Sequence, residues 1–236
     1  MKLIFIDIDN TLLDFDEYVR QTMREGFAAF GLKSYEEYMY NVFTEENRKL
    51  WTEIECGKIT FSELEKARWN NVFKVLGINF DGEVFEKYFR EKLFDSAIPV
   101  PGAYEMLEKL SDKYILSAAS NGPYEQQCHR LEISDMKKYF KYIFISEKAG
   151  ASKPSEKFFD YAFKKINAHE KYEITPSETM IIGDSMSSDI LGGMRYGIKT
   201  CYYDRQGRGI EKERPDIVVT SLCKVAKEVF KINEKQ

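Results

Sequence analysis

The chain has 236 residues, of which 43% are hydrophobic and 14% aromatic, so it can bury a substantial core and is not a disordered protein. Its formal net charge of −4, with lysines and arginines spread among acidic residues, argues against a nucleic-acid polymer or an anionic membrane as its main partner. Widely separated cysteines with no CxxC pair, no signal peptide and no long apolar run predict reduced thiols and a cytoplasmic location.

The chain opens on an apolar stretch, Leu3–Ile6, which predicts a strand buried on both faces, as in parallel sheets. Asp7 and Asp9 follow it and lie on one face of an extended chain. Burying both charges unpaired would be costly, and a hard cation such as Mg²⁺ would remove that cost. A strand that merely ends in a polar loop is the alternative. It explains one aspartate better than it explains the cluster Asp7-x-Asp9-x-Thr11.

Helical spacing without a convincing strand follows, from about residue 16 to residue 95. We predict four helices there, at residues 16–30, 34–55, 60–76 and 81–94. Ser34 and Thr60 are expected to be N-caps, and Thr60 with Glu63 matches a capping box. The dense aromatic residues of this block indicate a helical core.

Beyond the stiff segment 98–102, helices and strands alternate. We predict helices at 103–110, 124–131, 154–166, 187–196 and 222–230, and strands at 114–119, 142–145, 180–182, 200–203 and 217–219. With the first strand, this pattern predicts an α/β fold with a doubly wound, mostly parallel, Rossmann-like sheet. The helical block at residues 15–98 is then an insertion into a core domain formed by residues 1–14 and 99–236.

Ligands bind such sheets outside the carboxyl ends of the strands. The second strand delivers Ser120-Asn121, a hydroxyl and backbone N–H groups able to hold phosphate oxygens. The third delivers Lys153-Pro154, and a proline in the first helical turn would place Lys153 at the rim of the helix's positive end.

The fourth strand delivers two further carboxylates, Asp184 and Asp189. Each of these loops, taken alone, has an ordinary explanation as a turn, a solvated lysine or a pair of helix-capping acids. Their order along successive strands predicts a site for a phosphoryl group with a bound Mg²⁺.

As a set, four motifs resemble the signature motifs of the haloacid dehalogenase superfamily: Asp7-x-Asp9-x-Thr11, Ser120-Asn121, Lys153-Pro154 and Gly183-Asp184-x4-Asp189. The resemblance covers the whole chain, and the inserted helical block is similar to that family's α-helical cap domain. A narrower resemblance, to the bacterial pyrimidine 5′-nucleotidase branch, rests on the segment 183–193 and on cap residues Trp51, Gly57, Ile59 and Arg68.

This resemblance implies a Mg²⁺-dependent phosphate monoester hydrolase that forms an aspartyl-phosphate. Asp7 would be the nucleophile, and Asp9 would be the general acid and then the base. The implied metal ligands are Asp7, the main-chain carbonyl of Asp9, and Asp184. Asp189 would either be a further ligand or contact the residues that bind the metal. The implied phosphate-binding residues are Ser120, Asn121 and Lys153, with Thr11 steadying the first loop.

The branch resemblance implies a nucleoside 5′-monophosphate as substrate, with pyrimidines preferred to purines. In the cap, Trp51, Gly57, Lys58 and Arg68 are expected near the leaving group. Bundle packing or a solvated surface is an equally good explanation for Trp51, Lys58 and Arg68.

Other functions remain open at this point. Within the family, a sugar-phosphate phosphatase or a sugar-phosphate mutase such as a phosphoglucomutase would share every core residue. A phospho-accepting receiver domain is the non-enzyme alternative, although it would be shorter and would lack the cap. A Gly-Asp-Ser esterase would need a histidine after Ser185, and a dinucleotide-binding enzyme would need a G-x-G-x-x-G loop; the sequence has neither. The sequence does not indicate an oligomeric state.

Overall fold

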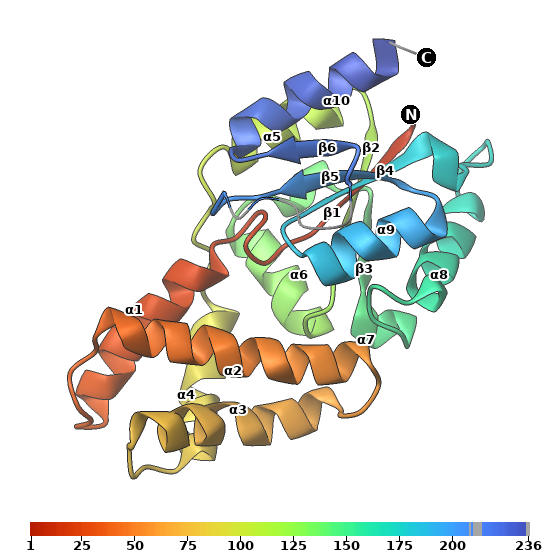
Figure 1. The fold of residues 1–236 in the computed structure, drawn as a ribbon. Helices are drawn as coiled ribbons and strands as arrows, with labels where there is room; N and C mark the ends of the chain where they lie inside the picture. Colours follow the sequence, from red (N-terminus) through yellow and green to blue (C-terminus); the bar gives the residue numbers. More distant parts are fainter. Residues whose placement is uncertain (208, 210–213, 235–236) are drawn as a thin grey trace. The chain divides into compact units, whose positions relative to one another are not determined.

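The computed structural model of the chain describes residues 1–207, 209 and 214–234. Contacts along the chain divide it into two compact units (Figure 1). The core unit contains Met1–Asp14 and Ala97–Gln236, and the cap unit contains Phe15–Ser96. The inserted block is predicted at residues 15–98, and the cap unit spans Phe15–Ser96.

In the part of the chain that the structure describes, the core unit is built on six parallel strands in the order β3-β2-β1-β4-β5-β6. The strands are β1 (Leu3–Ile6), β2 (Ile115–Ser120), β3 (Tyr142–Ile145), β4 (Thr179–Gly183), β5 (Lys199–Tyr203) and β6 (Ile217–Val219). Since β1 pairs with both β2 and β4, it lies inside the sheet, which is why its run of apolar residues is unbroken. The predicted doubly wound parallel sheet is confirmed.

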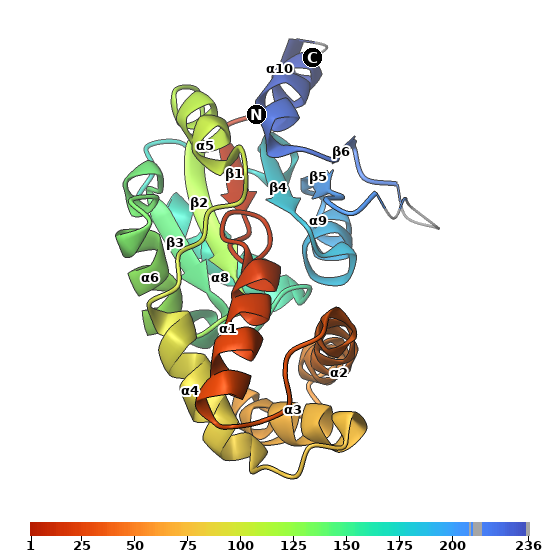
Figure 2. The same ribbon diagram turned by 90° about the vertical axis from the view of Figure 1, so that its left-hand side faces the viewer.

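Helices cover both faces of this sheet (Figures 1 and 2). Successive strand residues point to opposite faces, so Ile4 and Ile6 join one hydrophobic cluster and Leu3 and Phe5 join the other. On the first face pack α5 (Ala103–Ser111), α6 (Tyr124–Ile133) and α10 (Val225–Glu234). On the second pack α8 (Glu156–Asn167) and α9 (Leu191–Tyr196).

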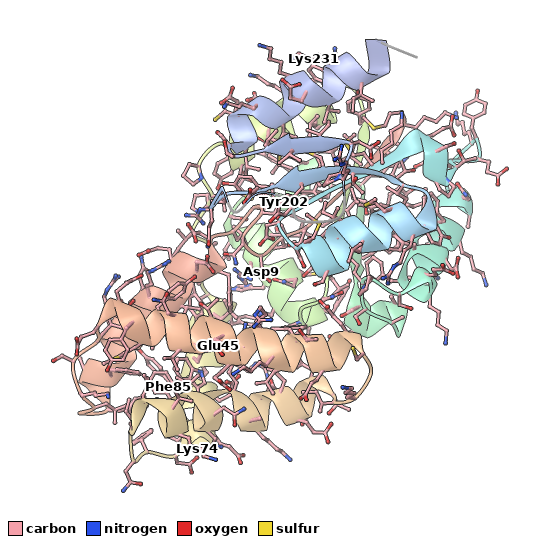
Figure 3. All side chains as sticks on the ribbon, in the orientation of Figure 1. Asp9, Glu45, Lys74, Phe85, Tyr202 and Lys231 are labelled. Atoms are coloured by element: carbon pink, nitrogen blue, oxygen red, sulfur yellow. The ribbon has the colours of Figure 1, made fainter. Side chains whose placement is uncertain are left out.

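The cap unit contains four helices: α1 (Phe15–Ala29), α2 (Glu37–Glu55), α3 (Phe61–Leu76) and α4 (Gly82–Phe94). The capping box at the start of α3 is confirmed, because the Thr60 hydroxyl accepts from the Glu63 N–H and the Glu63 carboxylate accepts from the Thr60 N–H. Buried aromatic rings hold the helices together. Phe85, labelled in Figure 3, packs edge-on against Trp69 with ring centroids 4.4 Å apart.

Two of the predicted helix starts are wrong. The second cap helix begins at Glu37 and not near Ser34, because Tyr35 anchors the connection by donating to Glu37 at 2.7 Å while the Arg24 guanidinium lies over its ring. Pro154 does not lie in the first turn of α8, which begins only at Glu156.

Other elements differ from the predictions by short turns. The expected helix at 187–196 is a π-helical turn, Met186–Ile190, followed by α9. The short helix α7 (Ser146–Ala149) and the 3₁₀ turns at Lys137–Tyr139 and Pro176–Glu178 were not predicted from the sequence. The helix expected at 222–230 begins with a 3₁₀ turn, Leu222–Lys224, before α10. None of the helices in the described part of the chain combines the length and apolar character that crossing a membrane requires.

Candidate active site

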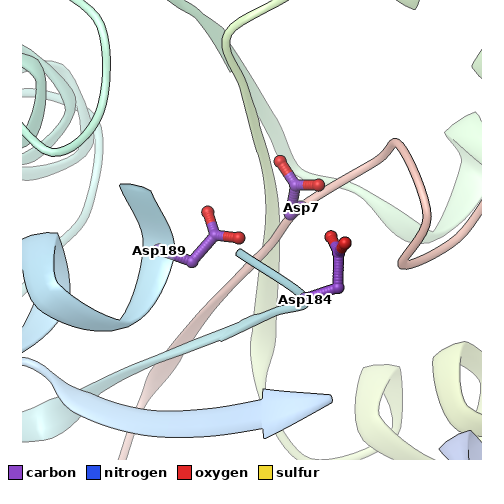
Figure 4. A group of neighbouring side chains, drawn as sticks. All are labelled: Asp7, Asp184 and Asp189. Atoms are coloured by element: carbon purple, nitrogen blue, oxygen red, sulfur yellow. The ribbon is translucent and has the colours of Figure 1, made fainter. Parts of the chain in front are cut away.

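Three carboxylates gather at the carboxyl edge of the sheet (Figure 4). Asp7 directly follows β1 and Asp184 directly follows β4, and the Asp7 N–H donates to the Ile182 carbonyl at 2.9 Å. One carboxylate oxygen from each of Asp7, Asp184 and Asp189 lies within 4.8 Å of the others. An all-oxygen set of this kind fits a hard divalent cation such as Mg²⁺.

Lys153 lies inside this carboxylate cluster, with only 1% of the residue exposed. Its Nζ donates to Asp7 Oδ1 at 2.7 Å, to Asp189 Oδ1 at 2.6 Å and to the Ala119 carbonyl at 2.5 Å, which uses all three ammonium hydrogens. Burial alone would lower the pKa of Lys153, but Asp189 and Asp7 raise it above its ordinary value. The expected position at a helix rim is therefore wrong, and Lys153 is a fixed buried cation beside Asp7.

Asp189 is fully buried and packs directly against Gly183. A Cβ at position 183 would lie 2.1 Å from Asp189 Oδ2, so only glycine fits the end of β4. That oxygen also accepts from the Ser185 N–H at 3.1 Å, while Oδ1 accepts from Lys153. The glycine of the fourth motif thus makes room for the carboxylate that fixes Lys153.

The loop after β1 is tied to the loop after β4. The Thr11 hydroxyl is buried and donates to Asp184 Oδ1 at 3.2 Å. Asn10 takes a left-handed conformation with a φ of 59°, and its N–H donates to the Leu13 carbonyl at 2.7 Å. The Thr11 contact orients a candidate metal ligand.

The Asn121 side chain binds the main chain of Lys153. Its Nδ2 donates to the Lys153 carbonyl at 2.9 Å, and its Oδ1 accepts from the Lys153 N–H at the same distance. Both ends of the amide therefore hold the main chain of Lys153, so the Asn121 side chain positions the lysine. Ser120, at the end of β2, is buried. Its hydroxyl and the Asp9 carboxylate accept hydrogen bonds from the same residue.

That shared residue is Gln127 of α6, which sequence analysis missed together with Arg130. Gln127 Nε2 donates to Asp9 Oδ2 at 2.6 Å, and the Arg130 guanidinium donates to Asp9 Oδ1 at 2.6 Å. One signal was available, because Gln127 lies four residues before the buried Leu131, on the apolar stripe of a helix where a polar residue needs a partner.

The model of one family, the haloacid dehalogenase-like hydrolases, matches residues 1–197. The chain belongs to this family. The assignment made from the four motifs is confirmed, and the protein is an enzyme of the hydrolase class.

Named relatives of this haloacid dehalogenase-like hydrolase include two pyrimidine 5′-nucleotidases. PynA of Streptococcus pneumoniae is 32% identical over 86% of this chain and 84% of its own length. YjjG of Escherichia coli is 28% identical over 87% of each chain. Among solved structures, the magnesium-bound HAD-hydrolase YfnB of Bacillus subtilis has a TM-score of 0.85 at 28% identity, over 98% of this chain and 97% of that one.

The predicted cap residues lie in two places within the cap unit. Trp51, near the end of α2, packs against Phe61 with ring centroids 5.9 Å apart, and Gly57 and Lys58 are exposed in the turn that follows. Gly57 has a φ of 68°, a conformation that favours glycine. Arg68 is only 3% exposed and is paired with Glu86 inside the unit, a position that does not support direct contact with a substrate.

The environment of Asp7 predicts a pH-dependent stability in the hydrolase without metal. Burial, opposed by Lys153 and reinforced by Asp189, raises the pKa of Asp7 from 3.8 to about 7. Between these values the folded protein holds a proton that the unfolded chain has released, so stability falls as the pH rises through this window. The Asp7→Asn variant has no titrating group at this position. Its free energy of unfolding should therefore rise, relative to that of the unmodified protein, from about pH 5 to about pH 8.

Thermal unfolding followed by circular dichroism in the presence of a chelator measures this difference. Asp112→Asn, which alters an exposed aspartate after α5, is the control and should show no such trend. An equal stability difference at both ends of the pH range would contradict the buried, proton-binding Asp7.

Proposed function

We propose that this hydrolase is a Mg²⁺-dependent phosphate monoesterase that forms an aspartyl-phosphate, and that its substrates are nucleoside 5′-monophosphates, pyrimidines before purines. The observation that carries the proposal is the buried contact between Lys153 and Asp7, next to the carboxylates of Asp184 and Asp189. The two nucleotidase relatives support the substrate class, and the magnesium-bound YfnB structure supports the metal.

In this proposal Asp7, Asp184 and the main-chain carbonyl of Asp9 hold the metal. Asp189 either adds a ligand or serves only to hold Lys153 and the Ser185 N–H, with which both of its oxygens are already engaged. The ion, when bound, partly neutralises the charge of the phosphoryl group.

The chain's own residues then divide the reaction into two displacements. An Asp7 oxygen attacks phosphorus, forming an aspartyl-phosphate as the bond to the leaving oxygen breaks. Asp9 gives a proton to that oxygen and later takes one from the water that hydrolyses the intermediate. The Ser120 hydroxyl and the backbone N–H of Asn121 donate to the phosphoryl oxygens, and Lys153 holds Asp7 in place.

The proposal is tested by measuring phosphate release from UMP, AMP, glucose 6-phosphate and p-nitrophenyl phosphate, with Mg²⁺ and after exhaustive chelation. We expect release from UMP and p-nitrophenyl phosphate that chelation removes and added Mg²⁺ restores. Contacts to the base can differ by about 1–3 kcal/mol between related substrates, so kcat/KM for UMP should exceed that for AMP by about tenfold or more.

Each part of the proposal can fail separately in this assay. Full activity after chelation would show that the reaction does not depend on a metal. A preference for glucose 6-phosphate would indicate a sugar phosphatase. Conversion of a sugar phosphate to an isomer without phosphate release would indicate a mutase. A stable phosphorylated protein without turnover would indicate a receiver.

A further inference from the structure

We propose that Gln127 and Arg130 of α6 are positioning residues that align the proton-transferring Asp9 with the phosphate-binding Ser120 through one hydrogen-bonded unit. The inference rests on the proposed function, because it assigns these two residues to the same site. Neither residue belongs to the four family motifs identified in the sequence, and neither is expected to touch the substrate.

Both residues are buried polar side chains on one face of α6. Gln127 is fully buried and Arg130 is 1% exposed, and they lie three residues apart, which places them on the same side of the helix. A buried amide or guanidinium is costly unless its hydrogen bonds are made. Their contacts therefore account for their presence in this face of the helix.

The direction of each hydrogen bond in this unit is fixed by chemistry. A guanidinium can only donate, so Arg130, 3.0 Å from Gln127 Oε1, requires the amide oxygen to face it. The two amide hydrogens of Gln127 then point the other way, to Asp9 Oδ2 at 2.6 Å and to Ser120 Oγ at 2.8 Å. Arg130 completes the unit by donating to Asp9 Oδ1 at 2.6 Å.

This arrangement determines what the Ser120 hydroxyl can do. Its oxygen accepts from Gln127 Nε2 and from the Gly122 N–H at 3.2 Å, which occupies both lone pairs. The single hydroxyl proton is then directed away from both donors. In the proposed reaction it points to a phosphoryl oxygen, so Gln127 makes Ser120 a donor to the phosphate.

The same unit fixes the Asp9 carboxyl group. Each of its oxygens accepts one hydrogen bond from α6, and the side chain is still 33% exposed. Each oxygen keeps a second lone pair, so a proton can pass to the leaving oxygen while the contacts to Gln127 and Arg130 persist. One helix face thus orients both the proton donor and the phosphate-binding hydroxyl.

The loop after β2 is shaped around Gln127. A Cβ at Gly122 would lie 2.6 Å from Gln127 Nε2 and 2.9 Å from its Cδ, so the close approach of loop and amide requires glycine. This provides a second way to disturb the unit: Gly122→Ala should displace the amide without removing a polar group.

The main test is Gln127→Leu, which removes the amide while keeping the approximate volume. With p-nitrophenyl phosphate, whose leaving group needs little protonation, kcat/KM should fall about tenfold through Ser120. With UMP, whose leaving oxygen needs a proton, it should fall about 100-fold because Asp9 is also misplaced. The Kd for inorganic phosphate, measured by calorimetry with Mg²⁺, should rise about tenfold.

Controls separate positioning from general damage to the fold. Gln126→Leu removes another buried glutamine of α6 and should leave all three quantities unchanged. In an Asp9→Asn background, Gln127→Leu should lower kcat/KM for UMP only about tenfold, as it does for p-nitrophenyl phosphate. The reason is that this background has no acid at position 9 whose placement could be disturbed. Gly122→Ala should reproduce the pattern more weakly, and it provides the test if Gln127→Leu does not fold.

The proposal would be overturned if Gln127→Leu lowered kcat/KM equally for the two substrates or left the Kd for phosphate unchanged. It would also be overturned if the losses in kcat/KM of the two single variants multiplied in full in the double variant. An unmodified protein that releases no phosphate from any ester would instead refute the proposed function. An active unmodified protein with a fully active Gln127→Leu variant would refute this inference alone.

Discussion

Asp7→Asn is expected to lower steady-state phosphate release by at least about 1,000-fold with every ester, because it removes the proposed nucleophile from the reaction. The fold should persist, since asparagine has nearly the same volume and can still accept a hydrogen bond from Lys153, which lies 2.7 Å from Asp7 Oδ1. Initial rates with UMP and p-nitrophenyl phosphate measure the loss, and circular dichroism verifies the fold.

A covalent intermediate gives a second measurement on the same pair of proteins. Acid quenching during turnover of a ³²P-labelled ester should trap label on the unmodified protein and none on Asp7→Asn. Asp112→Asn should turn over and trap label normally. Turnover of Asp7→Asn at a near-normal rate, in a preparation free of unmodified protein, would exclude Asp7 as the nucleophile.

The second large effect concerns the stability of the cap unit. Arg68 Nε donates to Glu86 at 3.0 Å, the second guanidinium nitrogen also binds that carboxylate, and the two residues are 3% and 4% exposed. Arg68→Ala would leave the Glu86 carboxylate buried without this partner, which typically costs about 3–5 kcal/mol in free energy of unfolding. Both tryptophans of the chain, Trp51 and Trp69, lie in the cap unit, so tryptophan fluorescence during denaturation follows this unit.

A matched ion pair joins the same two helices. Arg90 of α4 contacts Glu65 of α3, but their side chains are 39% and 21% exposed, so Arg90→Ala should cost only about 1 kcal/mol or less. Replacing the buried pair together, as Arg68→Met with Glu86→Leu, should recover most of the loss because no charge is left unpaired. Equal destabilisation by Arg68→Ala and Arg90→Ala would contradict this account of the buried pair.

The pattern of the sequence already determined much of the fold. The unbroken apolar run of β1 predicted an interior strand of a parallel sheet, and β1 does lie between β2 and β4. Thr60 and Glu63 predicted the start of α3 because a capping box depends only on residues close together in the chain. The expected N-cap at Ser34 was wrong because a local pattern does not show that Tyr35, in the connection between α1 and α2, contacts Arg24 of α1.

The candidate site divides in a similar way. The order of the four motifs along successive strands was sufficient to bring Asp7, Asp184 and Asp189 to one edge, because parallel strands end on the same side of a sheet. The sequence therefore determined that these three carboxylates meet. It did not determine which group binds which, because that depends on distances between side chains far apart in the chain.

Only the tertiary structure decided those partners. Lys153 could be read as a solvated lysine at a helix end, but its ammonium group reaches the interior and binds Asp7 and Asp189. Gln127 could be read as an ordinary helical residue, yet the packing of α6 on the sheet sets it beside Asp9. A helical or strand period reveals which face is buried, whereas the partner of a buried polar group is set by whichever element the fold places opposite it.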